Sequence, residues 1–244
     1  MTSAVPGGVL AIVPARGGSK GVPRKNVREI TPGRTLLHYV ADAAARAGRV
    51  DRAILSTEDE DIARVGREAG LEVPFIRPRE LAADDTAMLP VLRHALEQVD
   101  AGGWLPEYVV LLQPTSPLRR ETHIDEAVRL LIAERADSVV TVVEVPKHLS
   151  PDYVMKIDDG MLRPFLPEGA QVTRRQDVRP AYFRDGTVYA FRRDTIDRFG
   201  NIYGERCVPL LIDASDSLSI DSPEDWAAAE RILAARAAGG QVSR

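Results

Sequence analysis

A short apolar run near the amino terminus, residues 9–13, ends at Pro14 and leads directly into a loop rich in glycine and basic residues. The run is typical of a strand inside a sheet, because it has no polar position to face water. Glycine lets a backbone approach an anion closely, and basic side chains balance the anion's charge. In open α/β sheets, ligands bind at the carboxyl ends of strands. The segment therefore predicts an α/β sheet with a phosphate site after its first strand, and a solvated basic turn is the alternative.

Strand-like and helix-like segments alternate along the rest of the chain, as in a mainly parallel sheet flanked by helices. The expected strands are residues 9–13, 53–56, 73–76, 108–112, 138–143, 187–191 and 208–212. The expected helices are residues 36–47, 59–69, 86–99 and 124–134, and a last one after the N-cap Ser222 and Pro223. Residues 145–181 are punctuated by prolines and contain a hairpin signal at 156–160. We interpret this stretch as a functional insertion.

Composition excludes several classes of protein. A length of 244 residues allows one sizeable domain, or a domain with a subdomain. The formal net charge of −4 argues against nucleic-acid binding. No apolar run approaches the roughly 20 residues of a membrane helix, and the first residues lack the features of a signal peptide. The single cysteine, Cys207, excludes an intrachain disulfide. We expect a soluble cytoplasmic protein without nucleic-acid or membrane partners.

The glycine spacing in the loop fits neither a Walker A loop nor the dinucleotide fingerprint. Instead, residues 15–26, Ala-Arg-Gly-Gly-Ser-Lys-Gly-Val-Pro-Arg-Lys-Asn, resemble the nucleotide loop of the acylneuraminate cytidylyltransferases. This family comprises the CMP-sialic acid synthetases and relatives that activate other nonulosonic acids. Further strings at 77–86, 111–119, 174–187 and 216–225 resemble the same family in the same order. The resemblance covers about residues 9–232.

The resemblance implies a Rossmann-like nucleotidyltransferase fold and the transfer of CMP from CTP to the anomeric hydroxyl of a sialic-acid-like sugar acid, with release of pyrophosphate. The implied catalytic residues are Arg16, Lys20, Lys25 and Asp221. The implied nucleotide-binding residues are Ala15, Gly17, Gly18, Ser19, Asn26, Arg77 and Asp85. Asp84 looks like an added residue beside the family's Asp-Thr pair, which matches Asp85-Thr86, and Asp85 also fits a helix cap.

The implied sugar-acid residues are Gln113, Thr115, Ser116, Arg175 and Arg184. Guanidinium groups hold carboxylates in a bidentate fork, which suits an acidic sugar. The charge of the 174–187 segment alone would favour a solvated face. The resemblance also implies a homodimer in which the insertion at about 145–181 of a single 1–244 domain reaches the partner's site.

The family's two magnesium-binding aspartates match one aspartate and one serine here. Asp221 corresponds to the second, and Ser219 replaces the first. A neutral hydroxyl is a weaker ligand for Mg²⁺, so either Asp216 or a water replaces the carboxylate, or the nucleotide holds most of the metal. Asp225 is expected to cap the last helix. Two alternatives remain: a related enzyme with another acid acceptor or nucleotide, and a degenerate paralogue that binds nucleotide without turnover.

Overall fold

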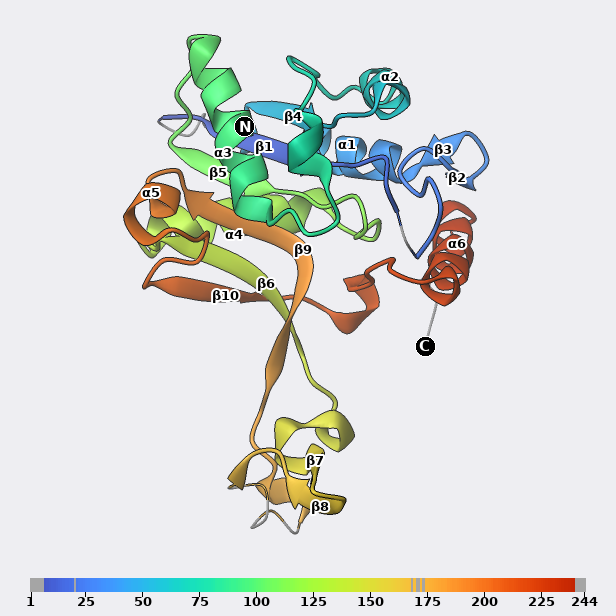
Figure 1. The fold of residues 1–244 in the computed structure, drawn as a ribbon, viewed down its shortest axis with the longest axis vertical. Coiled ribbons are helices and arrows are strands. Elements are labelled where there is room, and N and C mark those ends of the chain that lie inside the picture. Colours follow the sequence, from blue (N-terminus) through green and yellow to red (C-terminus); the bar gives the residue numbers. More distant parts are fainter. Residues whose placement is uncertain (1–6, 20, 168, 170–171, 173, 240–244) are drawn as a thin grey trace.

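The computed structural model describes residues 7–19, 21–167, 169, 172 and 174–239. Its core is a six-stranded sheet in the order β10-β6-β9-β5-β1-β4 (Figure 1). The strands are β1 (Val9–Pro14), β4 (Arg52–Ser56), β5 (Tyr108–Leu111), β6 (Ser138–Glu144), β9 (Tyr182–Arg192) and β10 (Cys207–Leu211). Strand β9 runs antiparallel to both neighbours, and the other pairs are parallel. The prediction of a mainly parallel α/β sheet is confirmed.

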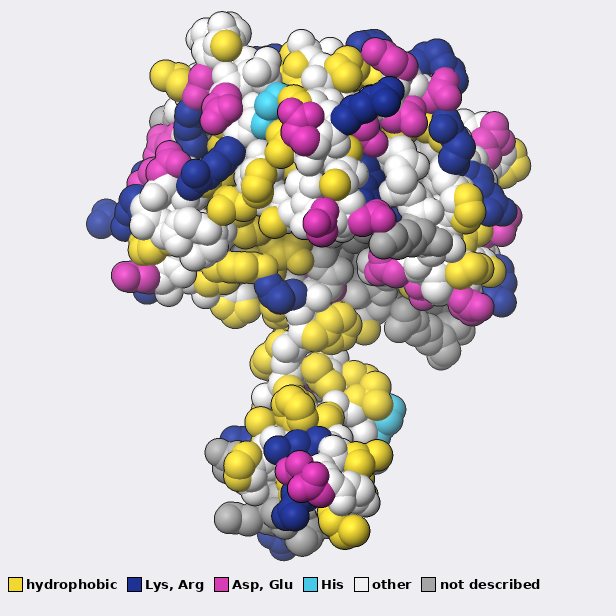
Figure 2. All heavy atoms as spheres, in the orientation of Figure 1, with side chains coloured by type: hydrophobic (Ala, Val, Ile, Leu, Met, Phe, Trp, Pro, Cys, Tyr) yellow, Lys and Arg dark blue, Asp and Glu magenta, His cyan; other side chains and the backbone are white. Residues whose placement is uncertain are grey.

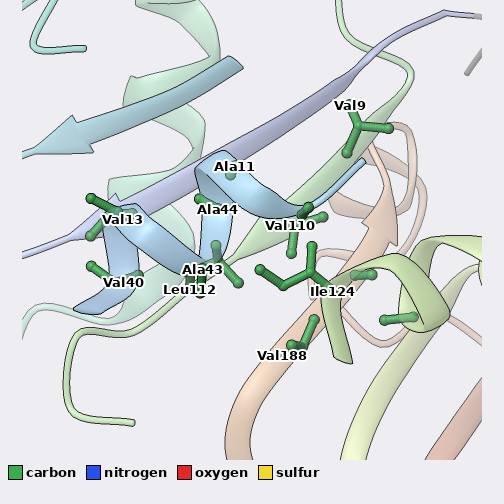
Figure 3. Close-up of a cluster of buried hydrophobic side chains, with 14 of the residues drawn as sticks. Val9, Ala11, Val13, Val40, Ala43, Ala44, Val110, Leu112, Ile124 and Val188 are labelled. Atoms are coloured by element: carbon green, nitrogen blue, oxygen red, sulfur yellow. The ribbon is translucent and has the colours of Figure 1, made fainter. Parts of the chain in front are cut away.

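Helices cover both faces of the sheet. Successive side chains on β1 point to opposite faces, so each face has apolar residues for helices to cover. Val9, Ala11 and Val13 pack toward α1 (Leu36–Arg46) and α4 (Glu121–Ala133), as Figure 3 shows. Leu10 and Ile12 pack on the opposite face against α3 (Met88–Ala101). The remaining helices are α2 (Glu60–Glu68), α5 (Thr195–Phe199) and α6 (Pro223–Ala237). These layers leave the carboxyl ends of the parallel strands open at one edge.

Two expectations about local structure have clear outcomes. The last helix begins as predicted: Ser222 is its N-cap, Pro223 is its first residue, and Ser222 and Asp225 form a capping box. The expected strand at residues 73–76 is wrong, since the structure has only an isolated bridge between Glu72 and Ile54 there. Pro74 has no N–H to donate to a ladder, which explains why pairing stops.

Residues 145–181 form an arm that projects from the sheet (Figure 1). Its hairpin joins β7 (Met155–Asp158) and β8 (Met161–Pro164). Asp159 and Gly160 both have positive φ at the two-residue turn, so the hairpin prediction is confirmed. The arm leaves and re-enters the core through β6 and β9, which pair with each other up to Glu144 and Tyr182.

Short elements complete the described part of the chain, among them the ribbon β2 (Glu29–Thr31) and β3 (Arg34–Thr35) and several 3₁₀ turns. These turns include η1 (Arg79–Ala82), η2 (Lys147–Leu149), η3 (Pro151–Tyr153), η5 (Arg175–Asp177) and η6 (Ala214–Asp216). None of the helices in the described ranges is both long and apolar enough to cross a membrane.

Candidate active site

The loops at the carboxyl edge of the sheet surround a cavity of about 500 Å³. Strands β1 and β5 are parallel neighbours, so the loops that follow them meet at this edge. The cavity is lined from the first loop by Ala15, Arg16, Gly18, Ser19, Gly21, Lys25 and Asn26, from the segment before α3 by Arg77, Ala83, Asp84 and Thr86, and from elsewhere by Gln113, Thr115 and Asp221. Ten of the predicted site residues therefore meet in one cavity.

The first loop is fixed by hydrogen bonds at both ends. The Ala15 N–H donates to the Ser56 carbonyl at 3.0 Å, and Asn26 Nδ2 donates to the Arg16 carbonyl at 3.0 Å. The loop also lies on the backbone of residue 221, since a Cβ at Gly21 would be 1.8 Å from the Asp221 carbonyl oxygen. Only glycine allows this approach. The phosphate loop and the segment before α6 are thus one packed unit.

The Gly21→Ala variant is expected to lose activity and stability together. The added methyl forces the loop away from Asp221, at a cost of about 1–3 kcal/mol in the free energy of unfolding. Denaturant unfolding and steady-state kinetics measure both effects. Gly18→Ala is the matched stability control, because nothing lies within 4 Å of a Cβ there. Equal stabilities for the two variants would contradict the packing argument.

Two described cations of the loop face the cavity. Arg16 pairs with Asp84 at 2.8 Å, and both side chains are partly exposed. Lys25 Nζ donates to the Ile220 carbonyl at 2.9 Å and lies 3.8 Å from Asp221 Oδ1. Burial lowers the pKa of Lys25, against the opposing charge of Asp221. The predicted catalytic residue Lys20 lies outside the described residues.

Arg24, in contrast, forms its ion pair outside the cavity. It pairs with Asp61 at 2.8 Å on α2 and is not among the residues that line the cavity. The predicted nucleotide-binding residue Gly17 lies beside α2 as well, where a Cβ would be 2.6 Å from Asp59 Oδ2.

Arg77 reaches the cavity from a buried position. Its side chain is 3% exposed and pairs with Glu58 at 2.8 Å. The expectation that Asp85 caps a helix is wrong, because the N-cap of α3 is Ala87; Asp85 is exposed and is not among the residues that line the cavity. Asp84 lines the cavity instead and lies two residues after the end of the 3₁₀ turn at 79–82.

Only some of the predicted sugar-acid residues line the cavity. Gln113 and Thr115 line the cavity. Ser116 is buried, and within the described ranges its hydroxyl has no hydrogen-bond partner. Arg184 lies on β9 outside the lining, where its guanidinium contacts the Tyr203 hydroxyl and lies 5.1 Å from that ring's centroid. Arg175 opens the 3₁₀ turn η5 in the arm.

A buried arginine holds the loop that carries Gln113. Arg119 donates from Nη2 to the Gln113 carbonyl at 2.7 Å and from Nε to the Thr187 carbonyl at 2.5 Å. Complete burial lowers the pKa of Arg119 to about 9. Strand β9 approaches this loop at Gly186, where a Cβ would be 3.4 Å from Gln113 Oε1 and 3.9 Å from the Tyr189 hydroxyl. Arg119 belongs to the 111–119 string, but no spacing singled it out, and Tyr189 lies just outside the 174–187 string.

The acids expected near magnesium have different surroundings. Asp221 is 74% exposed and accepts a hydrogen bond from the Ser219 hydroxyl at 3.0 Å. Asp225 accepts the Ser222 N–H at 2.9 Å, so its prediction as a cap is confirmed. Across the described chain no group of three His, Cys, Asp or Glu residues could hold a metal ion.

Asp216 does not fit its predicted role as a metal ligand. Its side chain is 5% exposed and accepts hydrogen bonds at 2.7 Å from both Arg120 and Arg236. His123 Nε2 lies 3.6 Å away, and burial lowers the pKa of this histidine. The turn η6 directs the carboxylate toward α4 and α6, and the cavity lining does not include it. We therefore withdraw Asp216 as a ligand.

A glycine-rich cationic loop and a cavity at the carboxyl edge of a mainly parallel sheet define a nucleotide-binding α/β enzyme. The chain belongs to the family described as "Cytidylyltransferase", because the model of that family matches residues 10–232. It is therefore a nucleotidyltransferase.

Curated relatives and solved structures resemble the chain over most of its length. A CMP-N,N'-diacetyllegionaminic acid synthase of Legionella pneumophila is 31% identical over 228 residues, 92% of this chain and 96% of that protein. An N-acylneuraminate cytidylyltransferase of Streptococcus agalactiae is 30% identical over 89% of this chain, which spans only 51% of that relative. The structure of a CMP:2-keto-3-deoxy-manno-octonic acid synthetase complexed with CTP has a TM-score of 0.70 at 15% identity and covers 94% of this chain and 99% of its own. This last likeness shows the fold.

Proposed function

We propose that the protein transfers CMP from CTP to the anomeric hydroxyl of a sialic-acid-like nonulosonic acid and releases pyrophosphate. The observation that carries the proposal is the single cavity with Arg16, Lys25 and Arg77 on its walls and Gln113 and Thr115 beside them. The names of the relatives from Legionella and Streptococcus support this substrate class. We assign the protein to the cytoplasm, where CTP is available.

In the proposed reaction the sugar hydroxyl oxygen attacks the α-phosphorus in line and forms the new P–O bond. The bond between the α-phosphorus and the α,β-bridging oxygen breaks, pyrophosphate leaves, and the hydroxyl proton passes to solvent. Catalysis of this kind depends on positioning and on stabilising the charge that develops on the phosphates. The positively charged side chains of Arg16, Lys20 and Lys25 would stabilise that negative charge. Arg16 can exchange its partly exposed partner Asp84 for a phosphate, because such surface pairs contribute only about 0–1 kcal/mol.

Magnesium fits the site as a metal shared with the nucleotide. Mg²⁺ is commonly held by one or two carboxylates together with substrate phosphates and water. Asp221 offers an exposed carboxylate on the cavity wall, beside the Ser219 hydroxyl. When bound, the ion would neutralise charge on the triphosphate. The lack of a second carboxylate at residue 219 is thus compatible with a divalent ion.

The homodimer is proposed from the surface of the arm. Figure 2 shows hydrophobic side chains over the arm and its base. Its exposed apolar residues are Leu149, Tyr153, Val154, Met155, Ile157, Met161, Leu162 and Phe165. An apolar surface of this kind is typical of a protein–protein contact and therefore supports the proposed homodimer. In such a dimer, the arm of one protomer would also bring its Arg175 toward the sugar acid bound by the other protomer.

The variant Ile157→Asp/Leu162→Asp is expected to be monomeric. These residues lie directly opposite each other in the hairpin and are 79% and 67% exposed. Two buried carboxylates would oppose association strongly. Analytical ultracentrifugation measures the oligomeric state, with Arg163→Gln on the other face of the hairpin as control. A wild-type protein that is monomeric at micromolar concentration would remove the dimer from the proposal.

The function itself is tested by pyrophosphate release from the four nucleoside triphosphates with a panel of sugar acids. CTP with a nonulosonic acid is expected to give the highest kcat/KM. A clear preference for another nucleotide would contradict the proposal and leave the phosphate site. CTP binding without turnover of any acid would favour the degenerate paralogue.

A further inference from the structure

Glu58 belongs to none of the sequence strings, yet its carboxylate connects two parts of the cavity. It lies between β4 and α2, and its side chain is 14% exposed. One oxygen, Oε1, accepts the Gly17 N–H at 2.7 Å, and the other, Oε2, accepts from Arg77 Nη2 at 2.8 Å. Hydrogen bonds to an ionised carboxylate are about twice as strong as neutral ones. One side chain therefore fixes both the phosphate loop and Arg77.

The Nε–H of Arg77 is a buried donor without a partner among the described residues. Its Nη2 donates to Glu58 and its backbone N–H donates to the Thr57 carbonyl at 2.8 Å. Its Nε is buried, and no group in the described ranges accepts from it. A buried donor without a partner is unfavourable, so a ligand that supplies an acceptor is favoured. Because Arg77 lines the cavity, that acceptor can come from the nucleotide.

The charge of Glu58 decides which acceptor suits Arg77. The carboxylate balances the guanidinium, so Arg77 attracts a phosphate less than Arg16 or Lys25 does. A neutral carbonyl needs only the hydrogen bond and no net charge. A pyrimidine with a ring carbonyl matches this requirement.

The bond to Gly17 sets the distance from this donor to the phosphate loop. Gly17 lies directly on the turn before α2, since a Cβ there would be 2.6 Å from Asp59 Oδ2. Glu58 and Asp59 are adjacent in that turn, so the loop and Arg77 share one rigid support.

We infer that Glu58 is a positioning residue for base selectivity, which holds Arg77 as a donor to a neutral pyrimidine carbonyl at a fixed distance from the phosphate loop. The inference rests on the proposed function. Glu58 acts through Arg77 and Gly17 and does not touch the reacting atoms.

The test is calorimetric binding of CTP and GTP to Glu58→Gln, with kinetics for the sugar acid. Glutamine keeps an acceptor for the Gly17 N–H but removes the charge and turns an N–H donor toward Arg77. CTP is expected to bind at least about 10-fold more weakly, as for a lost charged hydrogen bond. The preference for CTP over GTP should fall, while the sugar-acid KM stays within about twofold.

Glu72→Gln is the matched control. Glu72 also pairs with an arginine, Arg52, at 2.6 Å, but it is partly exposed and does not line the cavity. It should leave nucleotide binding unchanged. If Glu58→Gln does not fold, Arg77→Lys replaces it: lysine keeps the charge beside Glu58 and lacks Nε–H, so CTP binding should weaken at an unchanged melting temperature.

A double-mutant cycle separates positioning from general destabilisation. If Glu58 acts through Arg77, then Glu58→Gln/Arg77→Met binds CTP no more weakly than Arg77→Met alone, within about twofold. The inference would be overturned if the two substitutions weaken CTP binding by factors that multiply in the double variant. It would also be overturned if Glu58→Gln binds CTP as tightly as the wild type. Failure of the wild type to bind CTP would overturn the proposed function instead.

Discussion

Arg16→Ala is expected to lower kcat/KM for CMP transfer by about 10²-fold or more at an unchanged melting temperature. The side chain lines the cavity, and its pair with Asp84 is too exposed to stabilise the fold much. Its charge is needed when negative charge builds on the leaving pyrophosphate. Lys20→Ala is expected to behave in the same way. Pyrophosphate release and thermal unfolding measure the two quantities.

Arg24→Gln is the control from the same loop. It removes an equal charge, but Arg24 pairs with Asp61 on α2 and does not line the cavity, so turnover should stay within about twofold. Near-normal rates in both Arg16→Ala and Lys20→Ala, with unchanged stability, would show that the loop is a solvated basic turn.

Asp221→Asn and Asp216→Asn are expected to fail in different ways. Asp221 is exposed on the cavity wall, so Asp221→Asn should lower turnover sharply and raise the magnesium concentration required, with little change in stability. Asp216 is buried between Arg120 and Arg236. Asp216→Asn should cost about 1–3 kcal/mol of unfolding free energy and leave the magnesium requirement unchanged. Magnesium titrations of turnover and denaturant unfolding distinguish the two.

Ser219→Asp extends these experiments by restoring the family's first aspartate. The Ser219 hydroxyl already contacts Asp221, so an aspartate there should preserve activity and lower the magnesium required. Full wild-type activity in the presence of a chelator would contradict the metal proposal for both residues.

The fold was largely predictable because its strands carry simple signals. Residues 9–13 are uniformly apolar, as a strand covered on both faces must be, and Asp159-Gly160 marks a tight hairpin. The error at residues 73–76 came from weighing apolar character above Pro74, which removes the donor that pairing needs.

The site was predictable only where a sequence string contains residues that the backbone geometry itself requires. The loop after β1 needed its glycines to approach Asp221, so the motif itself located the cavity. Asp216 lies five residues before Asp221, but spacing along the chain does not tell which way a turn directs a carboxylate. Its partners Arg120 and Arg236 are 96 and 20 residues away. Asp84 and Asp85 could be separated only by the contact with Arg16.

The root of the arm has a practical consequence for engineering. The Val145 N–H donates to the Ala181 carbonyl at 2.8 Å, so the arm begins and ends at two hydrogen-bonded neighbours. A segment with such close ends can be exchanged without changing the length of either strand that carries it. A relative's arm grafted between these two residues keeps the nucleotide loop intact. Chimeras built at this junction therefore test whether the arm contributes to acceptor preference, as the proposed dimer implies, while the nucleotide loop stays unchanged.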